Sequence, residues 1–299
     1  MIHDRDKLRV HDGILSEFRF LIRPINLTLL ILLLSSCATT PTNRFIRTNP
    51  SIDKHLPQMT TIGVVNDVCL LMDDVGDDYH SIEASKSAAS LMLQGAKAYL
   101  KEKKGYQVNF QLSPTVCSFK DSEEKMNVAQ EKGTETFYEN SPFFVSESVK
   151  NDQSYEKALI HVIKQVQNSV EQNEHSPSEL FSKDDKIRDS LKVIAERANT
   201  EILFVINGNG VVVSTGKAIG QAVLTTVFTL GLVTARNTSY LDSYAALIDL
   251  KKGEMLWSNS LRIKDDPTDE DFYLKEWPHQ VLYHFPPSKI VVGHKSSKN

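Results

Sequence analysis

The sequence has little of what marks an enzyme or a nucleic-acid-binding protein. Its formal net charge is -4, and its 34 lysines and arginines are scattered among 38 acidic residues. Nucleic-acid binding depends on clustered positive charge, so we expect no nucleic-acid partner. The chain lacks a G-x-S-x-G nucleophile motif, and its nine histidines do not cluster. We therefore expect no catalytic residues and no cofactor.

Metal-binding spacings are missing as well. The three cysteines, Cys37, Cys69 and Cys117, form no CxxC pair, and there is no HxxxH. The acidic run at 73–78 (DDVGDD) lacks the spacing of an EF-hand, and it precedes a predicted helix whose N-terminus favours acids. A second acidic run at 265–271 has the same weakness. We interpret both runs as solvated loops and expect no metal site.

A phosphate loop is suggested and then excluded by the residues 210–218 (GVVVSTGKA). Five residues separate the two glycines instead of four. Ala218 stands where a Ser or Thr would hold magnesium. The stretch therefore predicts no nucleotide site.

A short apolar run lies near the N-terminus. Residues 25–34 are uncharged and about half the length that a membrane-spanning helix needs. Arg19 and Arg23 precede this run, and Ser35 and Ser36 follow it. A basic flank, a short apolar core and a small-residue exit are typical of a secretory signal peptide.

Residues 34–37 (LSSC) resemble a bacterial lipobox. In such signals a diacylglyceryl group is joined to the cysteine thiol, and cleavage leaves that cysteine first. We therefore expect residues 1–36 to be a signal peptide and Cys37 to be lipidated; the alternative is a signal anchor that ends near a cysteine. By resemblance to sorted lipoproteins, Ala38 favours the outer membrane with the domain facing the periplasm. Two or three acyl chains, palmitate among them, would hold the protein there essentially permanently.

The start of the chain departs from this pattern. Residues 1–18 contain four acidic side chains, which the n-region of a signal peptide normally lacks. We therefore expect translation to begin downstream, at Val10, Ile14 or Leu15 through a non-AUG codon.

The remaining sequence divides into three parts. Residues 37–59 are polar, contain three prolines and are predicted to be a lipidated tether. A flexible chain of roughly 20 residues spans about 25 Å, which would lift a domain clear of the bilayer. A folded periplasmic domain is expected over 60–287, followed by a polar tail over 288–299.

Removing Cys37 from the count leaves Cys69 and Cys117. Exported proteins occupy an oxidising space, where a remaining pair of cysteines favours a disulfide over a metal site. Two separate buried thiols remain the alternative.

Apolar patterning predicts an α/β domain with a mixed sheet. Residues 61–72 are β-rich, a helical pattern runs from Ser81 to Gly105, and 106–117 returns to strand. This β-α-β order favours parallel strands with a right-handed crossover. The two cysteines would lie near the ends of its two strands.

The middle of the chain predicts two flanking helices and a central strand. Residues 118–152 are polar and are interpreted as a surface excursion. Helices are predicted over 155–170 and 187–198, each with one apolar face. The apolar run 201–206 (EILFVI) is typical of a strand buried on both faces, and 207–210 (NGNG) indicates a turn.

The C-terminal part predicts an antiparallel hairpin and a helix. Strands over 240–250 and 254–263 would be joined by the turn 251–253. A last helix is expected to begin with Asp266 as its N-cap and to be kinked or divided by Pro278.

A second apolar segment, 218–235, contains 18 residues without a charge. Its length borders on a membrane span, although its threonines and glutamine make it polar for one. We weigh a buried core or subunit interface, a membrane-interacting or pore-forming segment, and a mobile exposed element. The candidate membrane or oligomer positions, spaced for close helix contact, are Gly216, Gly220, Leu224, Phe228 and Gly231.

Several of these features together resemble the curli-secretion-channel-type periplasmic lipoproteins. The most specific piece is D-L-x-x-G-x-x-L-W-S at 249–258. The strand 61–72 with its following helix, the stretch 198–206 and the closing helix before 285–287 (FPP) also carry the resemblance. It implies an α/β domain that assembles at the envelope, and it transfers no catalytic residue.

The sequence thus predicts a non-enzymatic, lipid-anchored cell-envelope protein that binds or assembles. Its expected partners are the membrane, through the N-terminal lipid, and envelope proteins, including further copies of itself. The alternative is a subunit of an oligomeric secretion or transport complex that uses 218–235 at the membrane or a subunit interface. A lipid-anchored envelope hydrolase is the third hypothesis.

Overall fold

Two long parallel strands form the centre of the sheet. β2 (Thr61–Asp73) and β8 (Ile202–Val213) pair from Gly63↔Leu203 to Asp73↔Val213. Both consist largely of β-branched and other apolar residues that are buried, as strands covered on both faces require. We call the end at which both strands finish the Asp73 end of the sheet, and the opposite end the Thr61 end.

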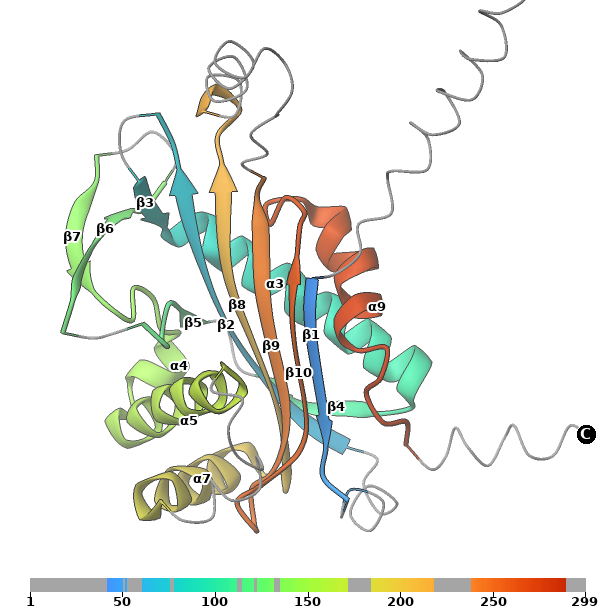
Figure 1. The fold of residues 1–299 in the computed structure, drawn as a ribbon. Helices are drawn as coiled ribbons and strands as arrows, with labels where there is room; N and C mark the ends of the chain where they lie inside the picture. The colour runs from blue at the N-terminus through green and yellow to red at the C-terminus, as the bar shows by residue number, and fades with distance from the viewer. Residues whose placement is uncertain are drawn as a thin grey trace, which may run out of the picture. The chain divides into compact units, whose positions relative to one another are not determined.

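The computed structural model describes residues 42–50, 52, 61–75, 78–111, 115–120, 123–131, 135–171, 184–217 and 238–288. Within these ranges ten strands form one mixed sheet in the order β1-β10-β9-β8-β2-β3-β6-β7, and β4 and β5 also pair with β2 (Figure 1). The remaining strands are β1 (Thr42–Thr48), β3 (Asp78–Ser81), β4 (Gln107–Gln111), β5 (Thr115–Val116), β6 (Lys125–Ala129), β7 (Phe137–Asn140), β9 (Tyr240–Asp249) and β10 (Glu254–Ile263). The predicted α/β class, parallel β2–β4 start and C-terminal β9–β10 hairpin are confirmed.

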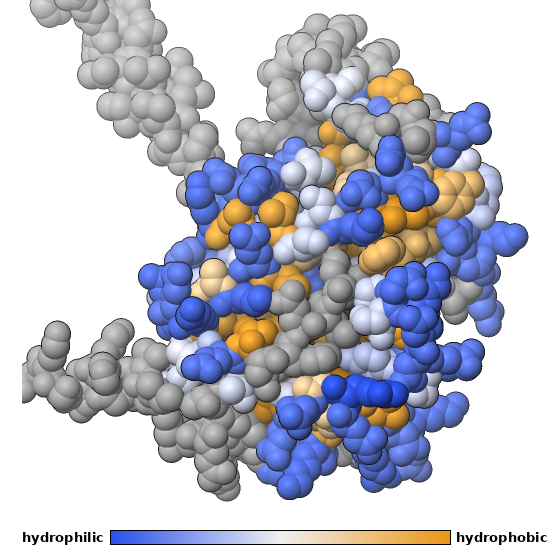
Figure 2. Space-filling model, turned by 180° about the vertical axis from the view of Figure 1, so that it is seen from behind, coloured by the Kyte–Doolittle hydropathy of each residue, from blue (hydrophilic) through white to orange (hydrophobic). Residues whose placement is uncertain are grey.

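Helices cover the sheet on both faces (Figure 1). One face carries α3 (Ile82–Tyr99) with its π-helical extension η2 (Leu100–Lys104), and the C-terminal η3 (Phe272–Glu276) and α9 (Trp277–Val281). The other face carries α4 (Glu147–Lys150), α5 (Gln153–Glu171) and α7 (Asp185–Ala198). The helices predicted over 155–170 and 187–198 are confirmed as α5 and α7. Seen from behind, the surface is largely polar with apolar groups between (Figure 2).

Buried asparagines fasten helices to the strands. Asn66 on β2 donates from Nδ2 to the carbonyl of Ala89 on α3. Asn207 on β8 donates to the carbonyl of Ile163 on α5 at 3.2 Å. Asn259 on β10 donates to the carbonyl of Val281 on α9 at 2.7 Å. Each amide therefore satisfies a helix carbonyl from within the sheet and fixes the position of one covering helix.

The turn predicted at 207–210 was wrong, because β8 runs straight through these residues. Its glycines serve close packing. A Cβ on Gly208 would lie 3.0 Å from Cε of Met92, and one on Gly210 would lie 2.6 Å from Cδ2 of Leu70. The two glycines thus let side chains from α3 and β2 approach β8 closely. Local sequence does not distinguish glycines with this packing role from glycines that mark a turn.

The acidic run at 73–78 was assigned to a helix-entry loop, and the structure corrects this. Asp73 ends β2 and Asp78 begins β3, which pairs antiparallel with β2 from Asp73↔Asp78 to Leu71↔His80. The N-cap of α3 is instead Ser81, whose Oγ accepts from the amide of Ala84 at 3.2 Å. The predicted β-α-β unit therefore contains an extra hairpin strand before its helix.

Part of the segment predicted as tether is a strand. β1 lies within 37–59 and pairs antiparallel with β10, from Thr42↔Arg262 to Thr48↔Trp257. An edge strand has one neighbour and needs no continuous apolar run, so its sequence (TNRFIRT) gives little signal.

The polar stretch 118–152 also contributes to the sheet. Its strands β6 and β7 extend the edge beyond β3, with His80↔Val128 and Val128↔Phe137 as register pairs. Val128 and Phe143 are buried beside the two cysteines. The expectation of a surface excursion was therefore wrong for these elements, whose short strands carry too few apolar residues to be recognised.

The C-terminal helix begins later than expected. Asp266 accepts from the amide and hydroxyl of Thr268 in a preceding turn, and helical residues start at Glu270. The helix is not divided at Pro278: it changes from the π-helical η3 to the α-helical α9 at Trp277, one residue before the proline. Against this helix lies Gly95 of α3, where a Cβ would overlap the carbonyl oxygen of Tyr273.

We predict that Gly95→Ala destabilises the protein. At an open helix position this change would add about 1 kcal/mol of stability, but here the methyl meets a backbone atom that cannot rotate away. Overpacking of this kind costs roughly 1–3 kcal/mol, measurable by urea unfolding. Gly216→Ala is the control, because its Cβ would lie 3.5 Å from Cγ2 of Val75, an ordinary contact. Equal or greater stability of Gly95→Ala would contradict the packing described.

Candidate functional site

The expected disulfide between Cys69 and Cys117 is confirmed. It joins β2 to the loop after β5 across a sequence separation of 48 residues. Both cysteines have no exposed surface, and Val116, Val128 and Phe143 pack around them. The hydroxyl of Ser141 donates to the carbonyl of Cys117 at 2.7 Å, so the loop is also held from its outer side.

A buried carboxylate lies in the same strand. Asp67 has no exposed surface and accepts from Oγ1 of Thr115 at 2.7 Å and from the amide of Ser118 at 3.0 Å. Burial raises the pKa of Asp67 to about 6, and the hydrogen bonds from Thr115 and Ser118 offset part of that rise. Because groups of the same domain surround the carboxylate, it is placed to hold the 115–118 loop against β2 and not to meet a substrate.

His80 on β3 is the second perturbed group in this region. Its ring packs against Phe143 with centroids 5.8 Å apart. Burial, together with the nearby charge of Lys120, lowers the pKa of His80 to about 4. The side chain is therefore neutral at pH 7.

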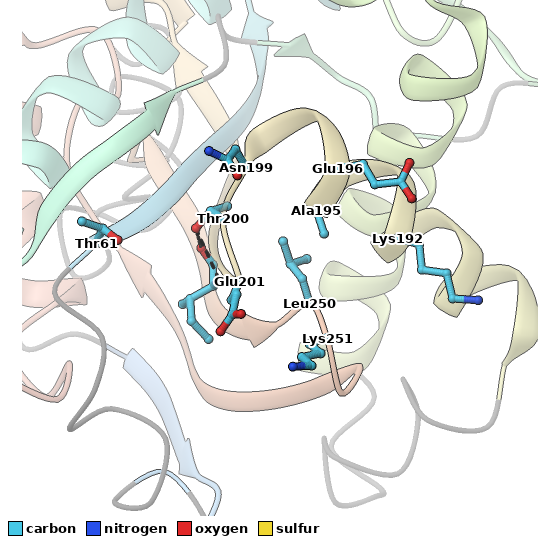
Figure 3. A pocket seen from close by; sticks show the side chains of 10 residues that line it. Thr61, Lys192, Ala195, Glu196, Asn199, Thr200, Glu201, Leu250 and Lys251 are labelled. Carbon is cyan, nitrogen blue, oxygen red and sulfur yellow. Dashed lines mark hydrogen bonds between the residues drawn. The ribbon is translucent and has the colours of Figure 1, made fainter.

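A pocket of about 720 Å³ opens at the Thr61 end of the sheet (Figure 3). Its lining comes from the end of α7, the turn that follows, the turn between β9 and β10, and the start of β2. These residues are Thr61, Lys192, Ala195, Glu196, Asn199, Thr200, Glu201, Ile202, Leu250 and Lys251. Asn199 caps α7 in the left-handed conformation, with φ of 46°, and turns the chain into β8.

Charged side chains dominate the lining of this pocket. Two amines, Lys192 and Lys251, and two carboxylates, Glu196 and Glu201, stand around a small apolar floor. The Oγ1 of Thr200 is engaged with the backbone of Ile202, donating to its carbonyl at 3.0 Å. The lining combines hydroxyl, amine and carboxylate side chains, so it offers charged and hydrogen-bonding groups to a polar ligand.

A larger half-exposed surface lies on the α5 side of the sheet, toward the Asp73 end. Along β8 the residues facing α3 stay buried, whereas alternate residues facing the other way become half-buried beyond Asn207. The strands β9 and β10 follow the same pattern. We call this surface the open sheet face; it comprises Asn209, Val211, Val213, Tyr240, Asp242, Tyr244 and Arg262.

A rigid ion pair organises the open sheet face. Arg262 donates from Nε to one carboxylate oxygen of Asp242 at 2.7 Å and from a terminal nitrogen to the other at 2.6 Å. Its guanidinium also lies 4.3 Å from the ring centroid of Tyr240. The hydrogen bond to Asp242 raises the pKa of Arg262. Bidentate pairing and stacking fix the arginine in one orientation before any partner arrives.

Most of the predicted site residues lie outside the described residues: Cys37, Gly220, Leu224, Phe228 and Gly231. Gly216 is described and is exposed, next to Val75. Lys217, which the sequence placed in a rejected phosphate loop, forms ion pairs with Asp73 and Asp78.

Membrane-spanning helices and metal clusters are both missing from the described residues. Among them, no helix is both long and apolar enough to cross a membrane. In the same ranges, no group of three or more His, Cys, Asp or Glu side chains is arranged to hold a metal ion.

Comparison with known proteins does not identify a family for this chain. No family model matches the sequence. No curated protein matches it either. A solved structure, a PelC dodecamer from Paraburkholderia phytofirmans, is similar at 9% identity with a TM-score of 0.24, over 76% of this chain and 84% of that one. Likeness at that TM-score supports no inference about function.

Sequence reasoning missed Asp67 and the open sheet face. Asp67 had a signal, because Asn66-Asp67 is a polar pair inside the buried run of β2, and buried polar residues need partners. The open sheet face had none, since its exposure depends on where α5 and α7 end over the sheet.

We predict that Asp67 makes stability fall as pH rises from 4 to 6. The ordinary pKa of 3.8 applies to the unfolded chain, and the value of about 6 to the folded one. Folding therefore favours the protonated carboxyl group. Its contribution to the free energy of unfolding is complete below pH 3.8 and is lost as the pH rises through about 6, which amounts to about 3 kcal/mol. Asp67→Asn should remove this dependence in urea unfolding at a series of pH values.

The contribution of His80 to stability changes with pH in the opposite direction, and it is present in both the wild type and Asp67→Asn. Its contribution is present above 6.5 and is lost as pH falls through about 4. It therefore cancels when the stability of Asp67→Asn is subtracted from that of the wild type. A difference that stays flat, or that grows with pH, would contradict the assignment.

Proposed function

We propose that this protein is an outer-membrane lipoprotein, anchored through Cys37, whose periplasmic α/β domain binds or assembles with other envelope proteins without catalysing a reaction. The signal-peptide pattern and the lipobox-like residues 34–37 support the anchor. The observation that carries the proposal is the buried Cys69–Cys117 disulfide, because disulfides form and persist in oxidising compartments such as the periplasm.

The open sheet face supports the binding role. Tyrosine and arginine are enriched where proteins meet, and here both stand on a rigid sheet. Arg262 is already held by Asp242 and Tyr240, so a partner would not have to order it. Val211 and Val213 add apolar surface beside it.

A second candidate function is a subunit of a secretion or transport complex that uses 218–235 at the membrane or a subunit interface. This function is favoured by the contacts that hold the residues on both sides of 218–235 to the sheet. On one side the amide of Ser214 donates to the carbonyl of Asp73 at 3.0 Å, and Lys217 pairs with Asp73. On the other side Ser239 accepts from the amide of Val213 at 3.0 Å. Both flanks are thereby tied to the Asp73 end of the sheet.

We predict that Cys37→Ala abolishes lipidation. Without the thiol no acyl group can be attached, so the variant should incorporate no labelled palmitate and should leave the membrane fraction. Ala38→Ser is the matched control and should behave like the wild type. A wild-type protein that carries no lipid on Cys37 would contradict the proposed anchor.

We predict that the open sheet face contacts protein partners in the envelope. A photo-crosslinking amino acid in place of Val211 should give a discrete adduct in intact cells, and the same probe in place of Lys157, exposed on α5, should give none. The mass of the adduct separates a second copy of this chain from another envelope protein. Equal yields at the two positions, or no adduct at position 211, would contradict the proposal.

A further inference from the structure

The chain between the proposed anchor and the sheet is short. β1 begins at Thr42, five residues after Cys37. Because an extended chain advances at most about 3.6 Å per residue, this connection reaches no further than about 18 Å. A tether over the whole of 37–59, as expected from the sequence, would have held the domain away from the bilayer. Instead β1 takes up the middle of this segment, so only the residues before Thr42 can act as a tether.

The sheet register shows where the connection enters. Thr42 pairs with Arg262, Arg262 with Asp242, and Asp242 with Asn209 on β8. Asn209 lies four residues before Val213, at the Asp73 end. β1 then runs from there toward the Thr61 end, so the proposed anchor approaches the domain from the Asp73 end.

Exposed apolar side chains gather at the same end. Among the described residues the exposed large hydrophobic side chains are Val75 at 70%, Phe137 at 40%, Tyr138 at 72% and Tyr283 at 62%. Val75 follows β2 directly, beyond Asp73.

The register places the two β7 aromatics level with the last residues of β2. Phe137 pairs with Val128, Val128 with His80, and His80 with Leu71. Tyr138 is one residue nearer the Asp73 end. Tyr283 lies elsewhere, since its carbonyl accepts from Lys104 at the end of η2.

We propose that the Asp73 end of the sheet faces the bilayer that holds the acyl chains of Cys37, and that Val75, Phe137 and Tyr138 contact its headgroup region. The inference rests on the proposed lipidation and adds the orientation of the domain. Tyrosine suits this position, because its ring is apolar and its hydroxyl stays in contact with water.

Two contacts on opposite edges of the sheet define that orientation. The anchor enters at β1, and the aromatic residues lie on β7, at the other edge of the strand order. Seven strand spacings of about 4.8 Å separate these edges, roughly 34 Å in all. An anchor at one edge and an apolar contact at the other keep the sheet from tipping onto either edge.

Charge attraction does not drive this contact. The Asp73 end carries Asp73, Asp74 and Asp78, of which Asp73 and Asp78 pair with Lys217. No polybasic cluster stands among the residues described there, so anionic lipid is not what holds this end. The contact should therefore withstand high salt, which screens electrostatic adsorption.

The test places a tryptophan at each end of the domain. The lipidated full-length protein is reconstituted in vesicles of phosphatidylethanolamine and phosphatidylglycerol that include a lipid with a spin-labelled headgroup, which quenches tryptophan on contact. Tyr138→Trp and Tyr283→Trp are matched variants, because both replace an exposed tyrosine. The native Trp257 and Trp277 are 1% and 0% exposed and give a constant background.

We expect the probe at position 138 to lose most of its fluorescence and to shift to shorter wavelength, in low and in high salt. The probe at position 283 should give the same signal as in vesicles without the spin label. Equal quenching of the two probes, or quenching at 138 that disappears in high salt, would overturn the inference while leaving the anchor intact. Absence of lipid on the Cys37 peptide by mass spectrometry would instead overturn the proposed function.

Discussion

The parallel pairing of β2 with β8 is the constraint on which the rest of the fold depends. It places two apolar strands side by side, so both faces of the sheet must be covered where the pair is apolar on both sides, as it is up to Asn207. Gly208 and Gly210 make room for Met92 of α3 and for Leu70. The buried amides of Asn66 and Asn207 then fasten α3 to one face and α5 to the other. The same strands carry Asp67 and Cys69, which hold the 115–118 loop to the sheet edge.

The parts of this fold that sequence predicts are those whose signal is local. The helices α5 and α7 repeat apolar residues at helical spacing, and β8 begins in a continuous apolar run. The disulfide followed from counting cysteines once Cys37 was assigned to the anchor. The turn predicted at 207–210 was wrong because the glycines there are required for close packing against neighbouring side chains, including Met92 of α3, and not for a change of chain direction. The short strands β1, β6 and β7 are defined by their neighbours in the sheet, so their residues alone did not reveal them.

The inclusion of β1 in the sheet shortens the connection between the proposed anchor and the folded domain. A tether of about 20 residues would let the domain sample a volume beneath the membrane. A connection of five residues ties one end of a rigid sheet near the proposed anchor, and Val75 and Tyr138 stand exposed at that end. In the orientation that we propose, the open sheet face, with Arg262 paired to Asp242, lies beside the bilayer and is accessible to partners. The proposed orientation therefore depends on one edge strand.

Hydrogen–deuterium exchange across residues 42–48 of the full-length protein tests this account most directly. If β1 pairs with β10, its bonded amides should exchange as slowly as those of the neighbouring β9–β10 hairpin, because opening them requires unfolding of the sheet edge. Exchange over 42–48 at the rate of an unstructured peptide would mean that these residues are a free tether, and would contradict both the shortened connection and the orientation derived from it.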